Sequence, residues 1–99
     1  MSNYGEYRTR VLRLTLLKSL SAAPGYRANE DILQEEAGAV GIEVSRAVIR
    51  SELTFLSEIG AITVKAVGSV MVATITLRGK EHVEGLTRLE GVNTPSPEA

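Results

Sequence analysis

Two arginines, Arg46 and Arg50, stand four residues apart, and the residues that would lie on the same side of a helix are small or polar. If this stretch is helical, both guanidinium groups lie on one face, one turn apart. Arginine can hydrogen-bond guanine through two nitrogens or contact a phosphate, and small neighbours let a helix approach DNA closely. The plainer interpretation is that both arginines only make an exposed helix face soluble in water. The candidate DNA-binding residues are Ser45, Arg46, Ala47, Arg50, Thr54 and, further along the chain, Lys65.

Few other residues could do chemistry. The chain has no cysteine and a single histidine, His82, which excludes disulfides, thiolate sites and most imidazole metal sites. No serine stands at motif spacing to His82, so we expect a surface histidine. Glu35 and Glu36 would point about 100° apart on a helix, which is no convergent acid–base pair. No glycine-rich run ends in Lys-Ser or Lys-Thr. We therefore expect no enzyme activity, no cofactor and no metal.

The elements that position these residues follow from the apolar spacing. Steps of three and four residues predict helices, and Pro24 ends the first of them. Asn29 and Ser45 have side chains that can cap the next two, and Gly41 and Gly60 are placed to close them. The three predicted helices span residues 6–22, about 30–40 and about 46–59.

After Gly60 the pattern alternates, which predicts strands at residues 61–67 and 70–77. Gly68-Ser69 suits a type II′ turn between them. If Val67 faces Val70, the opposite face of the hairpin carries three valines near its tip, enough apolar surface to be covered by a subunit or partner. The predicted core face of the hairpin comprises Ile62, Val64, Ala66, Met71, Ala73 and Ile75.

The last part of the chain predicts a short fourth helix. Thr76 can cap it, and it would run from Leu77 to about Glu84 before Gly85. Apolar residues further on are expected to pack back as another turn, at Leu86, Leu89 and Val92. We predict one domain at residues 1–92 and a disordered tail at residues 93–99.

The expected element order is helix, a short extended piece at residues 26–28, helix, helix and hairpin. This is the order of a winged helix-turn-helix, an α+β fold with a three-helix core, a C-terminal β-hairpin wing and, here, a short fourth helix. Its third helix would be the recognition helix, which enters the major groove of DNA. The alternative is a generic α+β domain that reads no groove.

Three segments carry a family resemblance: APGYRANEDIL, VSRAVIRSELTFLSEIGAITV and VATITLRGKEHVEG. They resemble the small winged-helix proteins encoded by Mu-like phages and prophages, over roughly residues 12–92. The resemblance implies a phage-borne DNA-binding protein, a transcriptional regulator or a DNA-handling accessory, in the cytoplasm of a bacterial host. The start of the chain lacks the apolar run of a signal peptide. The longest uncharged stretch in the whole chain, residues 66–77, is about half as long as a membrane-spanning helix.

Charge bears on the choice of partner. The formal net charge is −1, with five basic residues against one acidic residue in residues 1–27 but two against seven in residues 28–60. Since phosphate neutralisation supplies most non-specific affinity, the acids of the second helix, Asp31, Glu35 and Glu36, would have to point away from DNA. Basic residues of the first helix would contact phosphate or form ion pairs with a neighbouring helix; they are Arg8, Arg10 and Arg13.

Two hypotheses follow from the sequence. In the first, a homodimer binds double-stranded DNA through the third helix, because one small module buries little DNA surface. The candidate dimer contacts are Leu86, Leu89 and Val92, the first helix, or the valine-rich wing, and the sequence does not choose among them. In the second, the domain binds a phage or host protein through the acidic second helix and the valines of the wing.

Overall fold

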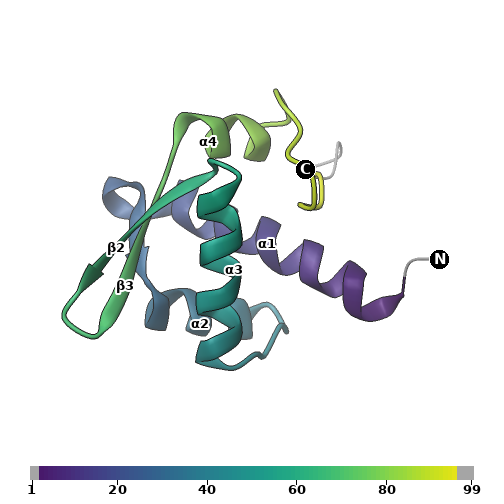
Figure 1. Cartoon of the computed structure of the whole chain (residues 1–99). Helices are drawn as coiled ribbons and strands as arrows, with labels where there is room; N and C mark the ends of the chain where they lie inside the picture. Colours follow the sequence, from purple (N-terminus) through teal and green to yellow (C-terminus); the bar gives the residue numbers. More distant parts are fainter. Residues whose placement is uncertain (1–2, 96–99) are drawn as a thin grey trace.

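The three helices predicted before residue 60 all form. The computed structural model describes residues 3–95, and its first elements are α1 (Tyr4–Ala22), the 3-10 turn η1 (Pro24–Tyr26), α2 (Glu30–Ala39) and α3 (Arg46–Glu58) (Figure 1). The predicted caps are confirmed, since Asn29 and Ser45 accept hydrogen bonds from the third backbone N–H of α2 and of α3, at 2.9 and 3.2 Å. α1 begins two residues earlier than expected because Asn3 caps it through the N–H of Glu6.

The predicted hairpin forms with the expected register. β2 (Ile62–Val67) and β3 (Val70–Ile75) pair antiparallel, with Val67 opposite Val70. Gly68 has a φ of 63°, the left-handed conformation that a glycine-first turn requires. The turn chemistry therefore sets which residues of the hairpin face the core.

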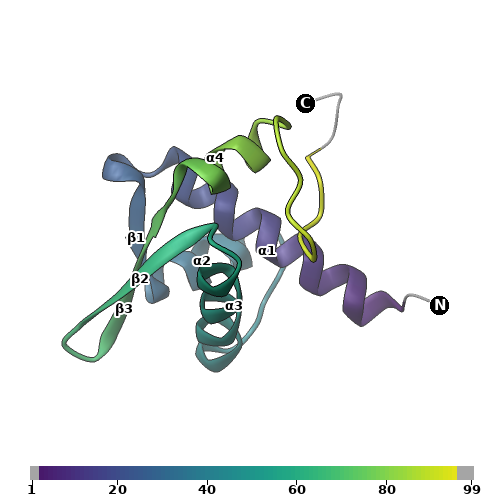
Figure 2. The ribbon, with the colours of Figure 1, turned by 45° about the horizontal axis from the view of Figure 1, so that its top comes forward.

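A third strand joins the hairpin to the rest of the fold. β1 (Arg27–Asn29) pairs antiparallel with β3, which gives the sheet order β1-β3-β2 (Figure 2). The extended piece was expected at residues 26–28 and lies one residue later. The reason is a left-handed turn at Gly25 and Tyr26, with φ of 68° and 60°, so that extended backbone starts only at Arg27.

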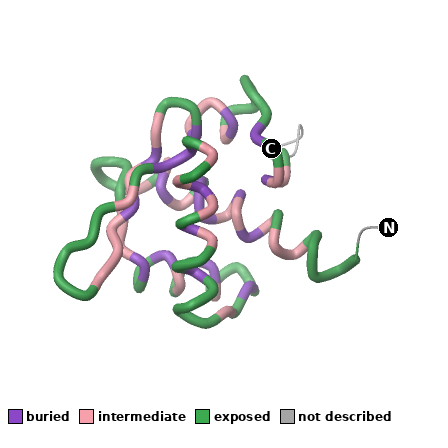
Figure 3. Tube along the Cα trace, in the orientation of Figure 1, coloured by how far each residue is buried: buried purple, intermediate pink, exposed green. Residues whose placement is uncertain are grey.

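The core lies between the helices and one face of this α+β sheet. On the hairpin, Ile62, Ala73 and Ile75 are buried as predicted, whereas Ala66 is exposed. Ala66 comes two residues before Gly68, near the end of β2. The turn end of the hairpin extends beyond the helices (Figure 3). The other buried apolar residues come mainly from the helices: Leu12, Leu14, Leu16, Leu17, Leu20, Leu33, Ala37, Ile42, Ile49, Leu53, Leu56 and Ala61.

The expectation of a surface histidine is wrong, because His82 is completely buried. It lies in α4 (Leu77–Val83), which Thr76 caps as predicted. The backbone N–H of Leu89 donates to His82 Nδ1 at 3.0 Å, so Nε2 carries the proton and donates to the carbonyl of Asn93 at 2.9 Å. The ring is buried because it supplies polar partners for a returning backbone that has no strand to pair with.

That returning backbone, residues 84–95, is called here the C-terminal segment. Leu89 and Val92 are buried, as expected of a segment that packs back, but Leu86 is 72% exposed. The N–H of Asn93, the first residue of the predicted tail, donates to the carbonyl of Arg10 at 3.2 Å. Residues 96–99 of the predicted tail lie outside the described residues. Within residues 3–95 no helix is both long and apolar enough to cross a membrane.

The burial of His82 leads to a prediction about stability. His82→Ala should lower the free energy of unfolding by about 2–4 kcal/mol, because it leaves a cavity and two unsatisfied backbone groups. Urea denaturation monitored by circular dichroism measures this free energy of unfolding. Leu86→Ala in the same segment is the control and should shift stability by less than about 0.5 kcal/mol. Equal midpoints for the two variants would contradict the assigned role of the ring.

Candidate functional site

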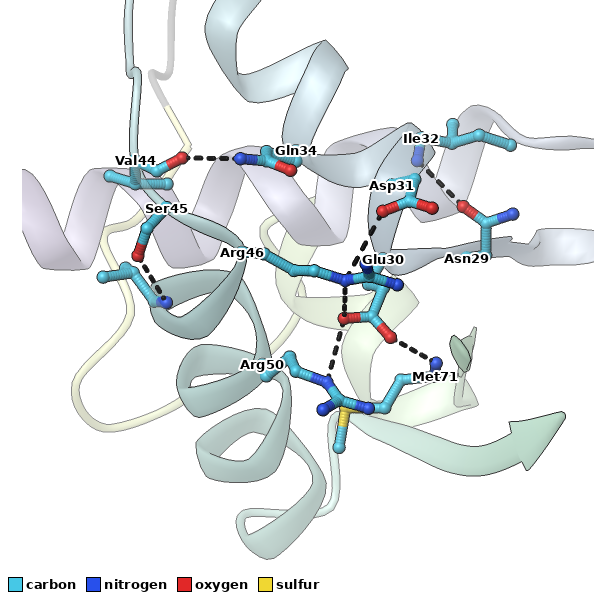
Figure 4. Close-up of polar contacts among 11 residues, drawn as sticks. Asn29, Glu30, Asp31, Ile32, Gln34, Val44, Ser45, Arg46, Arg50 and Met71 are labelled. Atoms are coloured by element: carbon cyan, nitrogen blue, oxygen red, sulfur yellow. Dashed lines mark hydrogen bonds and ion pairs between the residues drawn. The ribbon is translucent and has the colours of Figure 1, made fainter. Parts of the chain in front are cut away.

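The two arginines predicted to bind DNA converge on a buried carboxylate (Figure 4). Glu30, the first residue of α2, is completely inaccessible to solvent. Its Oε1 accepts a hydrogen bond from Nε of Arg46 at 3.0 Å and lies 2.9 Å from Nε of Arg50. The predicted helical spacing is thus confirmed, and the two guanidinium groups share one partner.

A third contact ties the carboxylate to the sheet. The backbone N–H of Met71, in β3, donates to Oε2 of Glu30 at 2.5 Å. Both carboxylate oxygens are therefore used, and three elements meet at one side chain: α2, α3 and β3. Burying a carboxylate is costly unless it is paired and hydrogen-bonded, and here it is both.

The electrostatics of Glu30 favour its ionised form. Burial raises the pKa of the carboxyl group, but the N–H of Met71, the hydrogen bond from Arg46 and the positive charges of Arg46 and Arg50 outweigh it, so that the pKa is lowered. The hydrogen bond to Glu30 and the charge of Asp31 raise the pKa of Arg46. The carboxylate of Glu30 and the guanidinium group of Arg46 are thus both charged at neutral pH.

The cluster of Glu30, Asp31, Arg46 and Arg50, called here the carboxylate–arginine cluster, has no net charge. Asp31 Oδ1 lies 3.6 Å from Nε of Arg46, so this acid faces the arginines and does not point away from them. Both arginine side chains remain 47% exposed. The hydrogen bond from Arg46 to Glu30 and the distances given for the ion pairs of both arginines are those of the Nε atoms. The exposed parts of the guanidinium groups are therefore left available for an external acceptor.

The other predicted site residues are more dispersed. Ser45, directly before α3, and Ala47 and Thr54 on α3 are exposed. The hydroxyl group of Thr54 donates to the carbonyl of Arg50 at 3.0 Å and so is turned onto its own helix. Lys65 is exposed on β2, in the hairpin. Ser45 serves the structure as the cap of α3. The structure thus brings together only Arg46 and Arg50 of the predicted set.

The basic residues of α1 divide between the interior and the surface. Arg13 forms an ion pair with Glu52 of α3, with Nε 2.6 Å from Oε1, and its guanidinium carbon lies 3.7 Å above the centre of the Phe55 ring. This confirms the ion-pair interpretation for Arg13. Arg8 donates to a backbone carbonyl at 3.4 Å, and Arg10 is exposed. The positive charge of Arg13 is therefore largely neutralised by Glu52 within the fold.

Sequence reasoning missed the role of Glu30. In the sequence it is one of two acids at a helix start, where the helix dipole favours negative charge, and nothing marks it as buried. Its partners lie 16, 20 and 41 residues away in the chain. The one local signal is its position directly after Asn29, which ends a strand. Among residues 3–95 there is no group of three or more side chains that could hold a metal ion.

The charge state of Glu30 leads to a prediction about pH. Its pKa is lower in the folded protein than the ordinary value of 4.5, so the unfolded chain binds more protons between the two values. The stabilisation is therefore complete above pH 4.5 and is lost as the pH falls through the folded-state pKa. Glu30→Gln should lower the free energy of unfolding by about 1–3 kcal/mol at pH 7, and the difference from the native chain should shrink at acid pH.

Urea denaturation at pH 7 and at pH 3.5 would measure both effects. Glu35→Gln, which removes an exposed acid of the same helix, is the matched control and should change little at either pH. A difference between native chain and Glu30→Gln that does not change with pH would show that the ionised carboxylate is not what stabilises the cluster.

Comparison with known proteins gives two relatives. The uncharacterized protein gp26 of Escherichia phage Mu is 40% identical over 91 residues, which cover 92% of this chain and 94% of gp26. An uncharacterized protein of Haemophilus influenzae is 38% identical over 77 residues, covering 77% of this chain and 74% of that protein. No family model matches the chain, and no solved structure matches it significantly. The predicted relation to proteins of Mu-like phages is confirmed, and this chain belongs to the family of phage Mu protein gp26.

Proposed function

We propose that the protein is a winged helix-turn-helix that binds double-stranded DNA, with α3 in the major groove. The observation that carries the proposal is the carboxylate–arginine cluster, in which Nε of Arg46 and Nε of Arg50 both lie against Glu30 while each side chain remains 47% exposed. The element order and the β1-β3-β2 sheet support the fold assignment, with the hairpin in the place of the wing.

The geometry suits base recognition because the arginines are already oriented. A free arginine loses rotamer freedom when it binds, and a carboxylate that holds Nε removes part of that cost beforehand. With Nε engaged, the two Nη groups form the remaining edge, which can donate to O6 and N7 of guanine. Exposed Ala47 beside them leaves room for close approach of the helix.

The neutral charge of the cluster predicts how such binding would depend on salt. The two arginines are offset by Glu30 and Asp31, so the cluster adds little to non-specific attraction for phosphate. Other cations on the surface, such as Arg10 and Lys65, would have to supply the backbone contacts. We therefore expect modest affinity for random DNA, and discrimination between sequences that depends on Arg46 and Arg50.

Selection from a random pool of duplexes, followed by fluorescence anisotropy with the selected duplex at stepped salt concentrations, tests this function. Arg46→Ala and Arg50→Ala should each weaken binding about tenfold or more, since a bidentate contact to a base contributes about 1–3 kcal/mol. Arg50→Lys keeps the charge but loses the two-nitrogen edge, and should bind the selected and random duplexes alike. Arg88→Ala, an exposed residue of the C-terminal segment, is the control. Unchanged binding by the α3 variants would contradict the assigned role of the helix.

The second candidate is a protein-interaction module. It is favoured by Val67, which is 55% exposed at the hairpin tip, together with the exposed acids Glu35 and Glu36 of α2. The DNA titration separates the two: absence of binding even at low salt would reject the DNA proposal and favour this one. Val70→Asp, on the outer face of the hairpin, should then impair a protein complex while Arg46→Ala leaves it intact.

A further inference from the structure

One side of α1 carries a row of residues that is exposed at its two ends and half-buried in the middle. The spacings of three and four residues place the row on a single helix face. Its first two members, Tyr4 and Tyr7, are 76% and 56% exposed, and they belong to the part of α1 that projects beyond the other elements (Figures 1 and 2). The row, called here the outer row, comprises Tyr4, Tyr7, Val11, Thr15, Lys18 and Ala22.

The last members of the outer row line a groove between α1 and α2. The groove has a volume of about 740 Å³, within the range of sites that bind other molecules. Its α2 side presents Ile32 and Val40, which are 44% and 65% exposed. Its polar residues include Lys18, Arg27 and Glu36. One helix thus displays exposed aromatic rings at one end and a largely apolar groove at the other.

We propose that a second copy of this chain covers both surfaces. The two α1 helices would pack antiparallel about a two-fold axis near Val11 and Thr15, with Tyr4 and Tyr7 of each copy in the groove of the other. Tyr7 and Lys18 are eleven residues apart, which is about three turns and about 16 Å along one helix face. An antiparallel pair centred between them brings Tyr7 against Lys18 of the second copy, and the reverse contact follows by symmetry.

The chemistry of the two surfaces is complementary. Lys18 and Arg27 at the groove offer cations to the faces of the entering tyrosine rings, and Glu36 offers an acceptor to a phenol hydroxyl group. The chain already makes such a contact internally, with Nζ of Lys80 3.7 Å from the centre of the Tyr26 ring.

The residues at the proposed axis fit the symmetry. A residue at a two-fold axis faces its own copy, so a charge there would meet a like charge. Val11 and Thr15, between Tyr7 and Lys18 on the outer row, are uncharged and half-buried. The charged residues between Tyr7 and Lys18 all lie outside the outer row: Arg8, which donates to the carbonyl of Glu43, Arg10, and Arg13, which is paired with Glu52. The dimer surface does not involve Arg46 or Arg50, so it does not rest on the proposed function.

Sedimentation equilibrium of the full chain tests the dimer. We expect the native chain to form dimers. Tyr7→Asp should weaken dimerisation roughly thirtyfold for each tyrosine contact that is lost. The total effect should be larger, because each dimer contains two copies of Tyr7. Its circular dichroism should not change, since Tyr7 is exposed. Leu86→Asp, at a position that is also exposed but lies outside both surfaces, should dimerise like the native chain. A monomeric native chain, or a Tyr7→Asp variant that dimerises normally, would overturn the proposal.

The absence of cysteine from the sequence allows a direct test of the arrangement. A mixture of the Tyr7→Cys and Lys18→Cys variants should give a disulfide-linked heterodimer under mild oxidation, because the two positions meet across the axis. Each variant alone should remain largely unlinked, since Tyr7 and its copy would be about 16 Å apart along the helix direction. Equal linkage in the single variants, or none in the mixture, would exclude the antiparallel pairing.

Discussion

The buried carboxylate of Glu30 is the interaction on which the arrangement of the other elements depends. It accepts from α3 through Arg46 and from β3 through Met71, while it belongs to α2. An ionised group inside a protein is tolerated only if its partners stay in place, so the angle between α2 and α3 and the position of the hairpin are fixed together. The same carboxylate sets the orientation of the two arginines that α3 presents to solvent. Structural stability and the candidate site are thus built from one contact.

The parts of the fold that could be predicted from sequence are those set by neighbours along the chain. Asn29 and Ser45 cap the next residues, and the turn at Gly68 fixes the register of the hairpin. The helical spacing of Arg46 and Arg50 was likewise local information. Glu30 and His82 were misjudged because their partners are remote: a polar residue among charged neighbours looks solvated unless the returning chain that pairs with it is known.

The uneven charge of the sequence has a largely structural meaning. A basic first third and an acidic middle third meet in the fold, where Arg13 of α1 pairs with Glu52 of α3. Within the middle third, Arg46 and Arg50 are offset by Glu30 and Asp31. A basic or acidic stretch of this sequence is therefore weak evidence about a polyanionic partner, because many of its charges form ion pairs within the fold. The exposed surface of α1 includes two large aromatic side chains of the outer row, those of Tyr4 and Tyr7.

The C-terminal segment is attached to the rest of the molecule by a small number of separate contacts. His82 holds Leu89 and Asn93, the carbonyl of Arg10 receives the N–H of Asn93, and Arg13 donates to the carbonyl of Gly91 at 2.9 Å. None of these belongs to the sheet or to the ladder of hydrogen bonds within a helix. Such a segment opens as a cooperative unit of its own, at a lower free energy than the whole domain. Its amide hydrogens would accordingly exchange with solvent long before those of β3, and each opening would briefly uncover the part of the core that Leu89 and Val92 cover.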